Sequence, residues 1–392
     1  MRFSSNIDRL EPSATMAVSA LARRLSAEGR DIIDLSAGEP DFDTPDWIRD
    51  AGRRAVDEGH TRYTPAAGLP ELREAAAAFM AGSGHPSPTS DEVMVTAGAK
   101  QALFNAAFAL FGPGDRVAVA APYWTSYPQI VGLAQAEPVI VRGDEARDFR
   151  LTPEDLDGAG GISGLILCSP SNPTGTVYSL DELRALAAWA RERGVWVLSD
   201  EIYRKIHYED GGKPAPGFLD LGPEERGPTV VIDGVSKCFA MTGWRIGFAW
   251  SDPEVVAKMG AIQSHTTSNP ATPSQMAALE AVSNRERADA SMAEMREAFQ
   301  RRRDLVVNGL RNGLPVLTYL EPKGAFYLFL RVDALFRPGE DSTTFCSRLL
   351  EEAEVALVPG AAFGDDRFVR LSFAASEDHL REALRRLERA LT

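Results

Sequence analysis

Lys237 and Arg245 stand eight positions apart in the segment 234–247, which is rich in glycine, serine and apolar residues. A lysine amine in such a setting can form a Schiff base with an aldehyde cofactor, and the planar fork of an arginine can grip a phosphate. Viewed singly, each residue has a simpler explanation, as a solvated lysine and as an arginine paired with a carboxylate. The surroundings favour the chemical interpretation, because they lack the mixture of glutamate and lysine that is typical of a solvated face.

Two more groups that could do chemistry follow predicted strands. The strand 92–96 turns through Gly98 and Ala99 directly into a helix, which leaves backbone N–H groups free to bind an anion. A merely tight turn would show the same sequence pattern. Asp200 ends the nearly all-apolar strand 195–199, where an unpaired carboxylate would be costly. We therefore expect a cationic partner for Asp200, with the cap of a helix N-terminus as the alternative.

Three other polar or aromatic side chains have ordinary explanations when they are considered alone. Trp124 follows a predicted strand, where tryptophan usually packs into the core. Asn172 lies between two prolines that fix the backbone, and an asparagine in a turn often bonds its own main chain. Arg370 alternates with apolar residues in 368–373, as an edge-strand charge would.

The elements that must position these residues alternate between strands and helices through the middle of the chain. This order indicates an α/β fold with a mostly parallel sheet, whose ligand groups gather at the carboxyl ends of the strands. Gly98, Trp124, Asn172, Asp200 and Lys237 all fall just past predicted strands. We therefore expect them to meet in one crevice.

The segment 234–247 resembles, position for position, the lysine signature of the class I/II pyridoxal-phosphate aminotransferases. The run 169–175, Ser-Pro-Ser-Asn-Pro-Thr-Gly, is similar to the same family, and the similar segments cover nearly the whole chain. The branch of bacterial aspartate and aspartate/prephenate aminotransferases is the most similar. The resemblance implies the PLP-transferase type I fold, like that of aspartate aminotransferase. A mostly parallel central sheet flanked by helices would occupy a large domain, 45–285, and both termini, 1–44 and 286–392, would form a smaller α+β domain.

The resemblance also implies a role for each candidate residue. Lys237 would bind pyridoxal 5′-phosphate as a covalent aldimine and then act as general base, with Asp200 and Tyr203 completing the catalytic set. The residues implied to bind the cofactor are Tyr63, Gly98, Ala99, Trp124, Asn172, Asp200, Tyr203, Ser236, Lys237 and Arg245. Those implied to bind substrate are Gly38, Lys100, Trp124, Asn172 and Arg370, with Arg370 on the α-carboxylate.

Two of these roles rest on the resemblance alone. Tyr63 would reach across a homodimer interface to the cofactor phosphate of the neighbouring subunit, so that the active sites are shared. Lys100 would pair with the distal carboxylate of a dicarboxylic substrate. A lysine in the first turn of a helix opposes the macrodipole, so a structural reason for it is hard to find. A solvated lysine is the alternative. Glu11 stands where prephenate-accepting relatives carry a basic residue. An acidic group at this place would repel the ring carboxylate of prephenate, so aspartate is favoured over prephenate as the substrate.

The implied reaction exchanges an amino group between an amino acid and 2-oxoglutarate by a ping-pong mechanism. Aromatic, alanine-type or prephenate substrates remain alternatives, as does a carbon–sulfur lyase, because fold and cofactor do not fix the reaction. A pyridoxal-phosphate-binding regulator would need a helix-turn-helix module, for which the chain has no room. A nucleotide-dependent oxidoreductase would need a glycine fingerprint that is not in the sequence.

The composition of the chain disfavours several classes of binding partner. The formal charge of −14 disfavours nucleic acid and anionic lipid, and no apolar run is long enough to span a membrane. The 3 cysteines are too few for a disulfide framework, and the 5 histidines lie too far apart for a metal site. With no signal-peptide pattern at the N-terminus, we expect a cytoplasmic protein that binds amino acids and 2-oxo acids.

Overall fold

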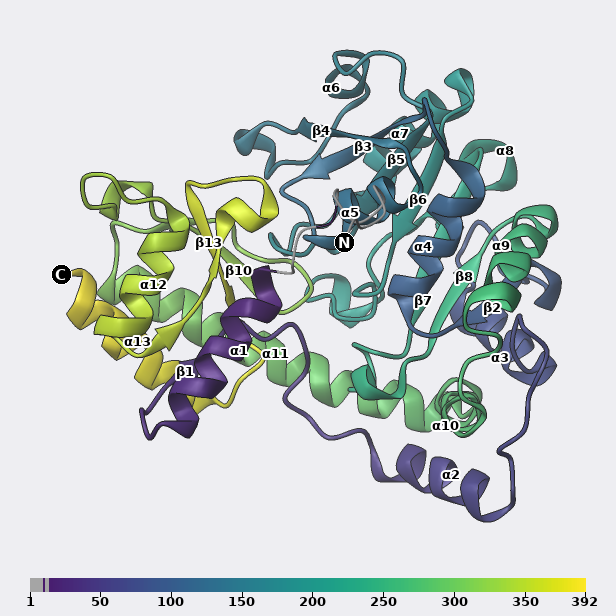
Figure 1. Ribbon diagram of the computed structural model, residues 1–392, viewed down its shortest axis with the longest axis horizontal. Helices are drawn as coiled ribbons and strands as arrows, with labels where there is room; N and C mark the ends of the chain where they lie inside the picture. The colour runs from purple at the N-terminus through teal and green to yellow at the C-terminus, as the bar shows by residue number, and fades with distance from the viewer. Residues whose placement is uncertain (1–9, 11–13) are drawn as a thin grey trace, which may run out of the picture.

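The computed structural model describes Leu10 and residues 14–392. Its larger sheet has seven strands in the order β2-β8-β7-β6-β5-β3-β4 (Figure 1). All run parallel except β8, which is antiparallel to both of its neighbours. The strands are β2 (Val93–Thr96), β3 (Arg116–Ala121), β4 (Glu137–Arg142), β5 (Gly164–Cys168), β6 (Trp196–Asp200), β7 (Thr229–Gly234) and β8 (Gly247–Trp250). The predicted α/β fold with a mostly parallel sheet is confirmed.

Helices cover both faces of this sheet, which explains why its strands read as nearly continuous apolar runs. In β5, for example, Leu165 and Leu167 pack into one core and Ile166 packs into the core on the other face. The helices are α1 (Ala14–Ala27), α2 (Asp46–Asp57), α3 (Pro70–Met80), α4 (Ala99–Leu110), α5 (Ser126–Leu133), α6 (Pro153–Asp157), α7 (Leu180–Arg193), α8 (Pro223–Arg226), α9 (Pro253–Thr266), α10 (Thr272–Ser283), α11 (Arg285–Gly313), α12 (Ser342–Glu352) and α13 (Glu377–Leu391). Helices α4, α5 and α9 contribute to the core of Ile166, and α3, α7 and α10 to the opposite one.

Helix α7 shows how local sequence fixes an element's ends. Its N-cap, Ser179, accepts a hydrogen bond from the backbone of Glu182, and the Glu182 carboxylate bonds back to Ser179. At the other end Gly194 adopts φ 65°, a left-handed conformation that suits glycine and ends a helix. The capping serine and the left-handed glycine therefore set the two ends of the helix at Leu180 and Arg193.

A smaller antiparallel sheet, in the order β12-β13-β10-β9, lies beside the large one (Figure 1). Its strands are β9 (Thr318–Tyr319), β10 (Tyr327–Arg331), β12 (Val358–Pro359) and β13 (Phe368–Ser372). Strand β13 has a neighbour on each side, so Arg370 is not on an edge strand and that interpretation is wrong.

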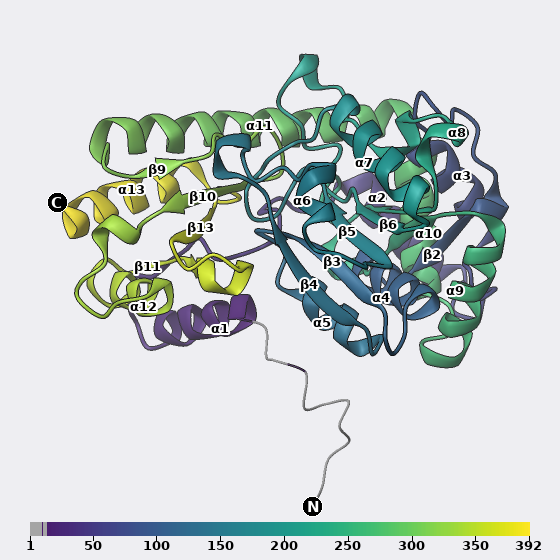
Figure 2. The ribbon, with the colours of Figure 1, turned by 90° about the horizontal axis from the view of Figure 1, so that it is seen from above.

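The segment 355–359 forms two short strands that pair with different partners. Strand β11 (Val355–Ala356) pairs in parallel with β1 (Ile33–Asp34), whereas β12 joins the small sheet through β13. The pairing of β1 with β11 brings the N-terminal segment against the C-terminal one. The 29-residue helix α11 runs alongside both sheets, from α10 to α13 (Figures 1 and 2). The exact division into domains 45–285 and 1–44 with 286–392 stays a prediction.

Charged and aromatic side chains connect the loop after β4 to the small sheet. Arg142 pairs with Asp365, and Glu145 accepts from Arg331 at 3.2 Å and from Arg367 at 3.1 Å. The ring of Phe149 packs edge-on against Phe368, in a cluster with Phe329 and Phe363. We call these residues, Arg142, Glu145, Phe149, Phe329, Arg331, Phe363, Asp365, Arg367 and Phe368, the joint.

Within the described part of the chain, none of the helices has the length and apolar character that crossing a bilayer requires. Residues 14–392 also contain no grouping of three or more histidine, cysteine, aspartate or glutamate side chains that could hold a metal ion. The three cysteines, Cys168, Cys238 and Cys346, are buried free thiols.

Candidate active site

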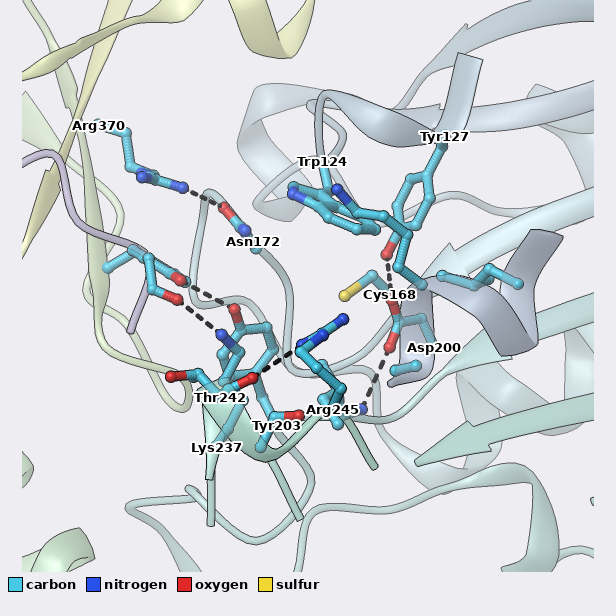
Figure 3. Close-up of a pocket in the computed structure, with 17 residues that line it drawn as sticks. Trp124, Tyr127, Cys168, Asn172, Asp200, Tyr203, Lys237, Thr242, Arg245 and Arg370 are labelled. Carbon is cyan, nitrogen blue, oxygen red and sulfur yellow. Dashed lines mark hydrogen bonds between the residues drawn. The ribbon is translucent and has the colours of Figure 1, made fainter. Parts of the chain in front are cut away.

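A cavity of about 350 Å³ lies at the carboxyl edge of the parallel strands and is closed on one side by the small sheet (Figure 3). Most of the predicted site residues line it: Gly38, Ala99, Lys100, Trp124, Asn172, Asp200, Tyr203, Ser236, Lys237, Arg245 and Arg370. Gly98 lies just behind this lining. Tyr63 is 89% exposed and does not line the cavity of its own chain.

The antiparallel strand β8 explains how Arg245 reaches the N-terminus of α4. Because β8 runs against its neighbours, it begins at the edge where β2 ends, and Arg245 lies two residues before this start. Gly98 has φ 85°, and a Cβ there would lie 2.3 Å from Nη2 of Arg245. A Cβ on Gly247 would lie 2.3 Å from the backbone nitrogen of Ala99. Both glycines are therefore needed for the arginine and the helix N-terminus to lie together.

The Arg245 guanidinium bonds only backbone oxygens in the described structure. It donates to the carbonyl of Thr242 at 2.9 Å and to that of Ala97 at 3.4 Å, and no described carboxylate lies within ion-pair distance. An unpaired guanidinium beside free N–H groups at a helix start is an anion site. Ser236 lines the same cavity.

Lys237 faces this anion site across the cavity. Its Nζ donates to the carbonyl of Gly38 at 2.6 Å (Figure 3). Burial lowers the pKa of Lys237 to about 8; Glu39 acts in the opposite direction, and Arg245 and Arg370 lower the pKa further. A lowered pKa gives the neutral amine that nucleophilic attack on a carbonyl requires. The interpretation of Lys237 as a solvated surface lysine is therefore not supported.

Asp200 is buried at the end of β6 and receives hydrogen bonds but no ion pair from the described residues. The Tyr127 hydroxyl donates to Oδ2 at 2.7 Å, and the backbone N–H of Ile202 donates to Oδ1 at 3.2 Å (Figure 3). Burial raises the pKa of Asp200 to about 6, against these hydrogen bonds and the charge of Lys237. The segment after Asp200 forms turns, so the alternative of a helix N-cap is wrong. No described residue forms an ion pair with Asp200, so the expected cationic partner stays a prediction.

Arg370 reaches the cavity from β13 of the small sheet and is 1% exposed. It donates to Oδ1 of Asn172 at 3.0 Å and to the carbonyl of Ser36 at 2.7 Å, and it lies 4.4 Å from the ring centroid of Tyr327. Its Nε is buried without a partner, and no described carboxylate pairs with it. A buried guanidinium with unused donors is complementary to a planar carboxylate.

Lys100 and Trp124 form another wall of the cavity. The Lys100 amine lies 4.9 Å from the ring centroid of Trp124, and its partial burial, followed by the charge of Arg245, lowers its pKa. Trp124 presents its ring to the cavity and contacts Tyr127 edge-on (Figure 3). Tyr203 is buried, and its hydroxyl bonds that of Tyr327 at 2.8 Å.

Several lining residues were not found by sequence reasoning. They are Leu103, Tyr127, Cys168, Ile202, Thr242 and Tyr327. Ile202 lies between two predicted site residues, and Tyr127 lies one helical turn after Trp124, so spacing gave some signal for both. Tyr327 gave little, because only the register of β10 against β13 places it near Arg370.

The cavity concentrates positive charge in a chain whose formal charge is −14. Lys100, Lys237, Arg245 and Arg370 line it, whereas Asp200 is the one lining carboxylate among the described residues. The two arginines provide separate places for a phosphate and a carboxylate. Asp200 can accept from a protonated ring nitrogen, and Trp124 offers a flat surface for a ring. The residues present therefore fit pyridoxal phosphate together with an amino acid.

The fold and this site define the class of pyridoxal-phosphate-dependent transaminases. Residues 30–387 match the family described as "Aminotransferase class I and II", and the chain belongs to this family. It is 42% identical to an aspartate aminotransferase of Geobacillus stearothermophilus, over 99% of this chain and 98% of that one. It is 43% identical to an aspartate/prephenate aminotransferase of Cereibacter sphaeroides, over 98% and 97% of the two chains.

Solved structures agree with this assignment. An aspartate aminotransferase of Thermus thermophilus, determined with maleate, has a TM-score of 0.92 and 43% identity, and the match covers 100% of both chains. The aspartate aminotransferase of Rhizobium meliloti gives a TM-score of 0.91 at 40% identity, covering 100% of this chain and 99% of that one. The predictions of the family, of an aspartate aminotransferase-like fold and of a transaminase that uses pyridoxal phosphate are confirmed.

The close contact between Gly98 and Arg245 makes a test of the anion site. Gly98→Ala should displace the Arg245 guanidinium and weaken the binding of pyridoxal phosphate to the apoenzyme by about 10-fold, the equivalent of about 1.4 kcal/mol. A fluorescence titration measures this affinity. Gly114→Ala is the matched control, because Gly114 has φ 93° but nothing within 4 Å of an added Cβ. Equal losses of affinity in the two variants would show that backbone strain, and not Arg245, is responsible.

Proposed function

We propose that this chain transfers amino groups between aspartate and 2-oxoglutarate by a ping-pong mechanism, with pyridoxal phosphate bound covalently to Nζ of Lys237. The observation that carries the proposal is the placement of Lys237 between two arginines that lack carboxylate partners among the described residues. When bound, the cofactor supplies an electron sink for the negative charge that develops at Cα of the amino acid. The remaining chemistry belongs to the side chains of this protein.

Contacts to four parts of the cofactor, its phosphate, ring face, ring oxygen and ring nitrogen, would hold it in a fixed orientation. Arg245, Ser236 and the N–H groups after Gly98 bind the phosphate, and Trp124 stacks on the ring. Asn172 and Tyr203 donate to the ring oxygen; Oδ1 of Asn172 already accepts from Arg370, so its amide nitrogen is the free donor. The Asp200 carboxylate holds a proton on the ring nitrogen and so strengthens the electron sink.

Substrate would bind between the cofactor and the small sheet. Arg370 clamps the α-carboxylate through its fork, with Asn172 and the backbone of Gly38 beside it. This would place Cα near Lys237, whose Nζ would take the proton from Cα and deliver it to the adjacent carbon of the cofactor. The lowered pKa of Lys237 suits this exchange, because a general base works best when its pKa is near the working pH.

The position of Lys100 favours a dicarboxylic substrate. Lys100 is the remaining cation that lines the cavity, and its amine lies beside Trp124 at the cavity wall. No carboxylate of the described residues lies within ion-pair distance of it. The relatives named above are aspartate or aspartate/prephenate aminotransferases, and the Thermus structure was determined with a dicarboxylate, maleate. Glu11, which favours aspartate over prephenate, lies outside the described residues. A carbon–sulfur lyase would release ammonia or thiol from the same site, whereas a transaminase forms glutamate from 2-oxoglutarate.

A homodimer with shared active sites is part of the proposal. Tyr63 is 89% exposed, yet its loop is held in place because the carbonyl of Arg62 accepts from Thr272 at 2.7 Å. Val56 and Phe108 are also exposed, at 55% and 48%. Exposed large apolar side chains on a held backbone favour contact with a second copy. We further propose a cytoplasmic location, which suits three buried free thiols.

The covalent role of Lys237 can be tested by trapping. Borohydride reduction of the holoenzyme, followed by peptide mapping, should place the pyridoxyl mass on the peptide that contains Ser236 and Lys237. Lys237→Arg should abolish the label, whereas Lys258→Arg, at an exposed lysine of α9, should retain it. A label on any other lysine would refute the assignment.

Lys100 can be tested with a set of amino donors. Lys100→Ala should lower kcat/KM for aspartate by about 10–100-fold, since a hydrogen bond to a charged group contributes about 1.5–3 kcal/mol. Alanine and phenylalanine have no distal carboxylate and should be affected much less. Lys100→Arg should restore part of the loss for aspartate. Equal losses for all donors would mean that Lys100 serves the cofactor or the fold, and not the substrate.

Subunit mixing tests the shared site. Tyr63→Ala and Lys237→Ala subunits are each inactive alone, but their hybrid has one site with both residues and one with neither. Random mixing should therefore restore about a quarter of wild-type activity, because about half of the dimers are hybrids with one intact site each. Sedimentation gives the oligomeric state of the mixture. A monomer, or a mixture that stays inactive, would exclude a contribution of Tyr63 across an interface.

A further inference from the structure

The buried side chains of Tyr127 and Asp200 form a hydrogen-bonded pair at the wall of the cavity where the ring of pyridoxal phosphate would lie. Tyr127 lies in the first turn of α5, is 2% exposed, and donates its hydroxyl to Oδ2 of Asp200 at 2.7 Å (Figure 3). Its backbone N–H donates to the carbonyl of Trp124 at 3.0 Å. The turn that carries Trp124 therefore also carries Tyr127, the residue that donates a hydrogen bond to Asp200.

The hydroxyl is fixed in its role as a donor. Burial, followed by the negative charge of Asp200, raises the pKa of Tyr127 well above its usual value, so the phenol stays protonated. A phenol has a single proton to donate, and here that proton is directed at Oδ2. Since the N–H of Ile202 holds Oδ1 at 3.2 Å, the carboxylate is held at both oxygens and cannot rotate.

Tyr127 is also the one side chain with a hydrogen bond to Asp200 among the described residues. The other titratable groups that act on the carboxylate are Lys237 across the cavity, Asp233 on β7 and the Cys168 thiol on β5. Lys237 favours the charged form of Asp200, whereas Asp233 opposes it. If the lysine amine is consumed by covalent attachment of the cofactor, its charge no longer supports the carboxylate in the same way. The Tyr127 hydroxyl then becomes the principal side-chain support.

We propose that Tyr127 is a positioning residue of the transamination reaction. Its hydroxyl keeps Asp200 ionised and turned toward the ring position, so that Asp200 can hold a proton on the ring nitrogen of bound pyridoxal phosphate. This role rests on the proposed function. It assigns to Tyr127 an effect on the chemistry that is separate from its contribution to the core around α5.

The protonation of the ring nitrogen is the direct readout. Nitrogen-15 NMR of the holoenzyme, loaded with pyridoxal phosphate labelled at the ring nitrogen, distinguishes the protonated from the unprotonated form. The wild-type enzyme should show a protonated ring across neutral pH. Tyr127→Phe removes one oxygen atom, leaves Oδ2 without its donor and raises the pKa of Asp200, so the proton shared by the two groups should move from the ring nitrogen to the carboxyl and the protonated ring fraction should fall.

Kinetics and affinity give two further readouts. Tyr127→Phe should lower kcat by about 10-fold with little change in KM for aspartate, because the substrate contacts are intact and the electron sink is weaker. Tyr178→Phe is the matched control, because Tyr178 is equally buried and its hydroxyl accepts from the N–H of Leu151 at 2.8 Å, away from the cavity. The control should lose some thermal stability but should leave the NMR signal and kcat unchanged.

A second variant covers the case in which Tyr127→Phe does not fold. Incorporation of 3-fluorotyrosine at position 127 keeps the shape and gives a stronger donor, so the ring nitrogen should stay protonated to a pH at least as high as in the wild type. A Tyr127→Phe variant that matches Tyr178→Phe in the NMR titration and in kcat, or a 3-fluorotyrosine variant whose ring nitrogen is less protonated than in the wild type, would overturn the role of Tyr127 alone. A wild-type enzyme that binds no pyridoxal phosphate would overturn the proposed function, and the role of Tyr127 with it.

Discussion

Positive charge that gathers in one crevice without carboxylate counter-ions is the constraint on which the rest of the structure depends. Arg370 is buried with a free Nε and no carboxylate partner among the described residues, and Arg245 has only backbone acceptors. Burial of the Arg370 charge without a counter-ion is costly and lowers the stability of the empty protein, whereas the Arg245 guanidinium is exposed and solvated. Anionic ligands that bind the folded state alone recover this free energy. The site is therefore prepared for two anions before either arrives.

The backbone is shaped to permit this arrangement. A fully parallel sheet would begin every strand at the far edge and could not place Arg245 next to the N-terminus of α4. The reversed strand β8 removes that restriction, and Gly98 and Gly247 provide the close approach that any side chain would prevent. Arg370 comes from a separate sheet, where β13 holds it between two neighbours. The two arginines thus converge from elements that are far apart in the sequence.

The sequence predicts the parts of the site that depend on local pattern. Gly98, Asp200 and Lys237 could be placed because parallel strands end at one edge, and the long lysine signature identified the family. The sequence did not predict Tyr127 or Tyr327 as site residues. Their positions depend on the orientation of a helix and on the register of a strand, which no local spacing specifies. The same reason explains the incorrect alternative for Arg370: an alternating strand looks alike at an edge and in the middle of a sheet. The cation expected at Asp200 stays a prediction, because the described residues give the carboxylate hydrogen bonds but no ion pair.

The joint between the β4 loop and the small sheet combines two interactions that respond differently to conditions. The ion pairs of Glu145 with Arg331 and Arg367 are partly exposed, so dissolved salt screens them, with a Debye length of about 10 Å at 0.1 M. The packing of Phe149 against Phe368 is insensitive to salt but weakens on cooling, as apolar burial does. Dilute, cold surroundings therefore favour the ion pairs relative to the aromatic packing, and warm, saline surroundings favour the aromatic packing. The alignment of β13, and with it the position from which Arg370 meets a carboxylate, is accordingly buffered against changes in the medium that would disturb a joint built from either interaction alone.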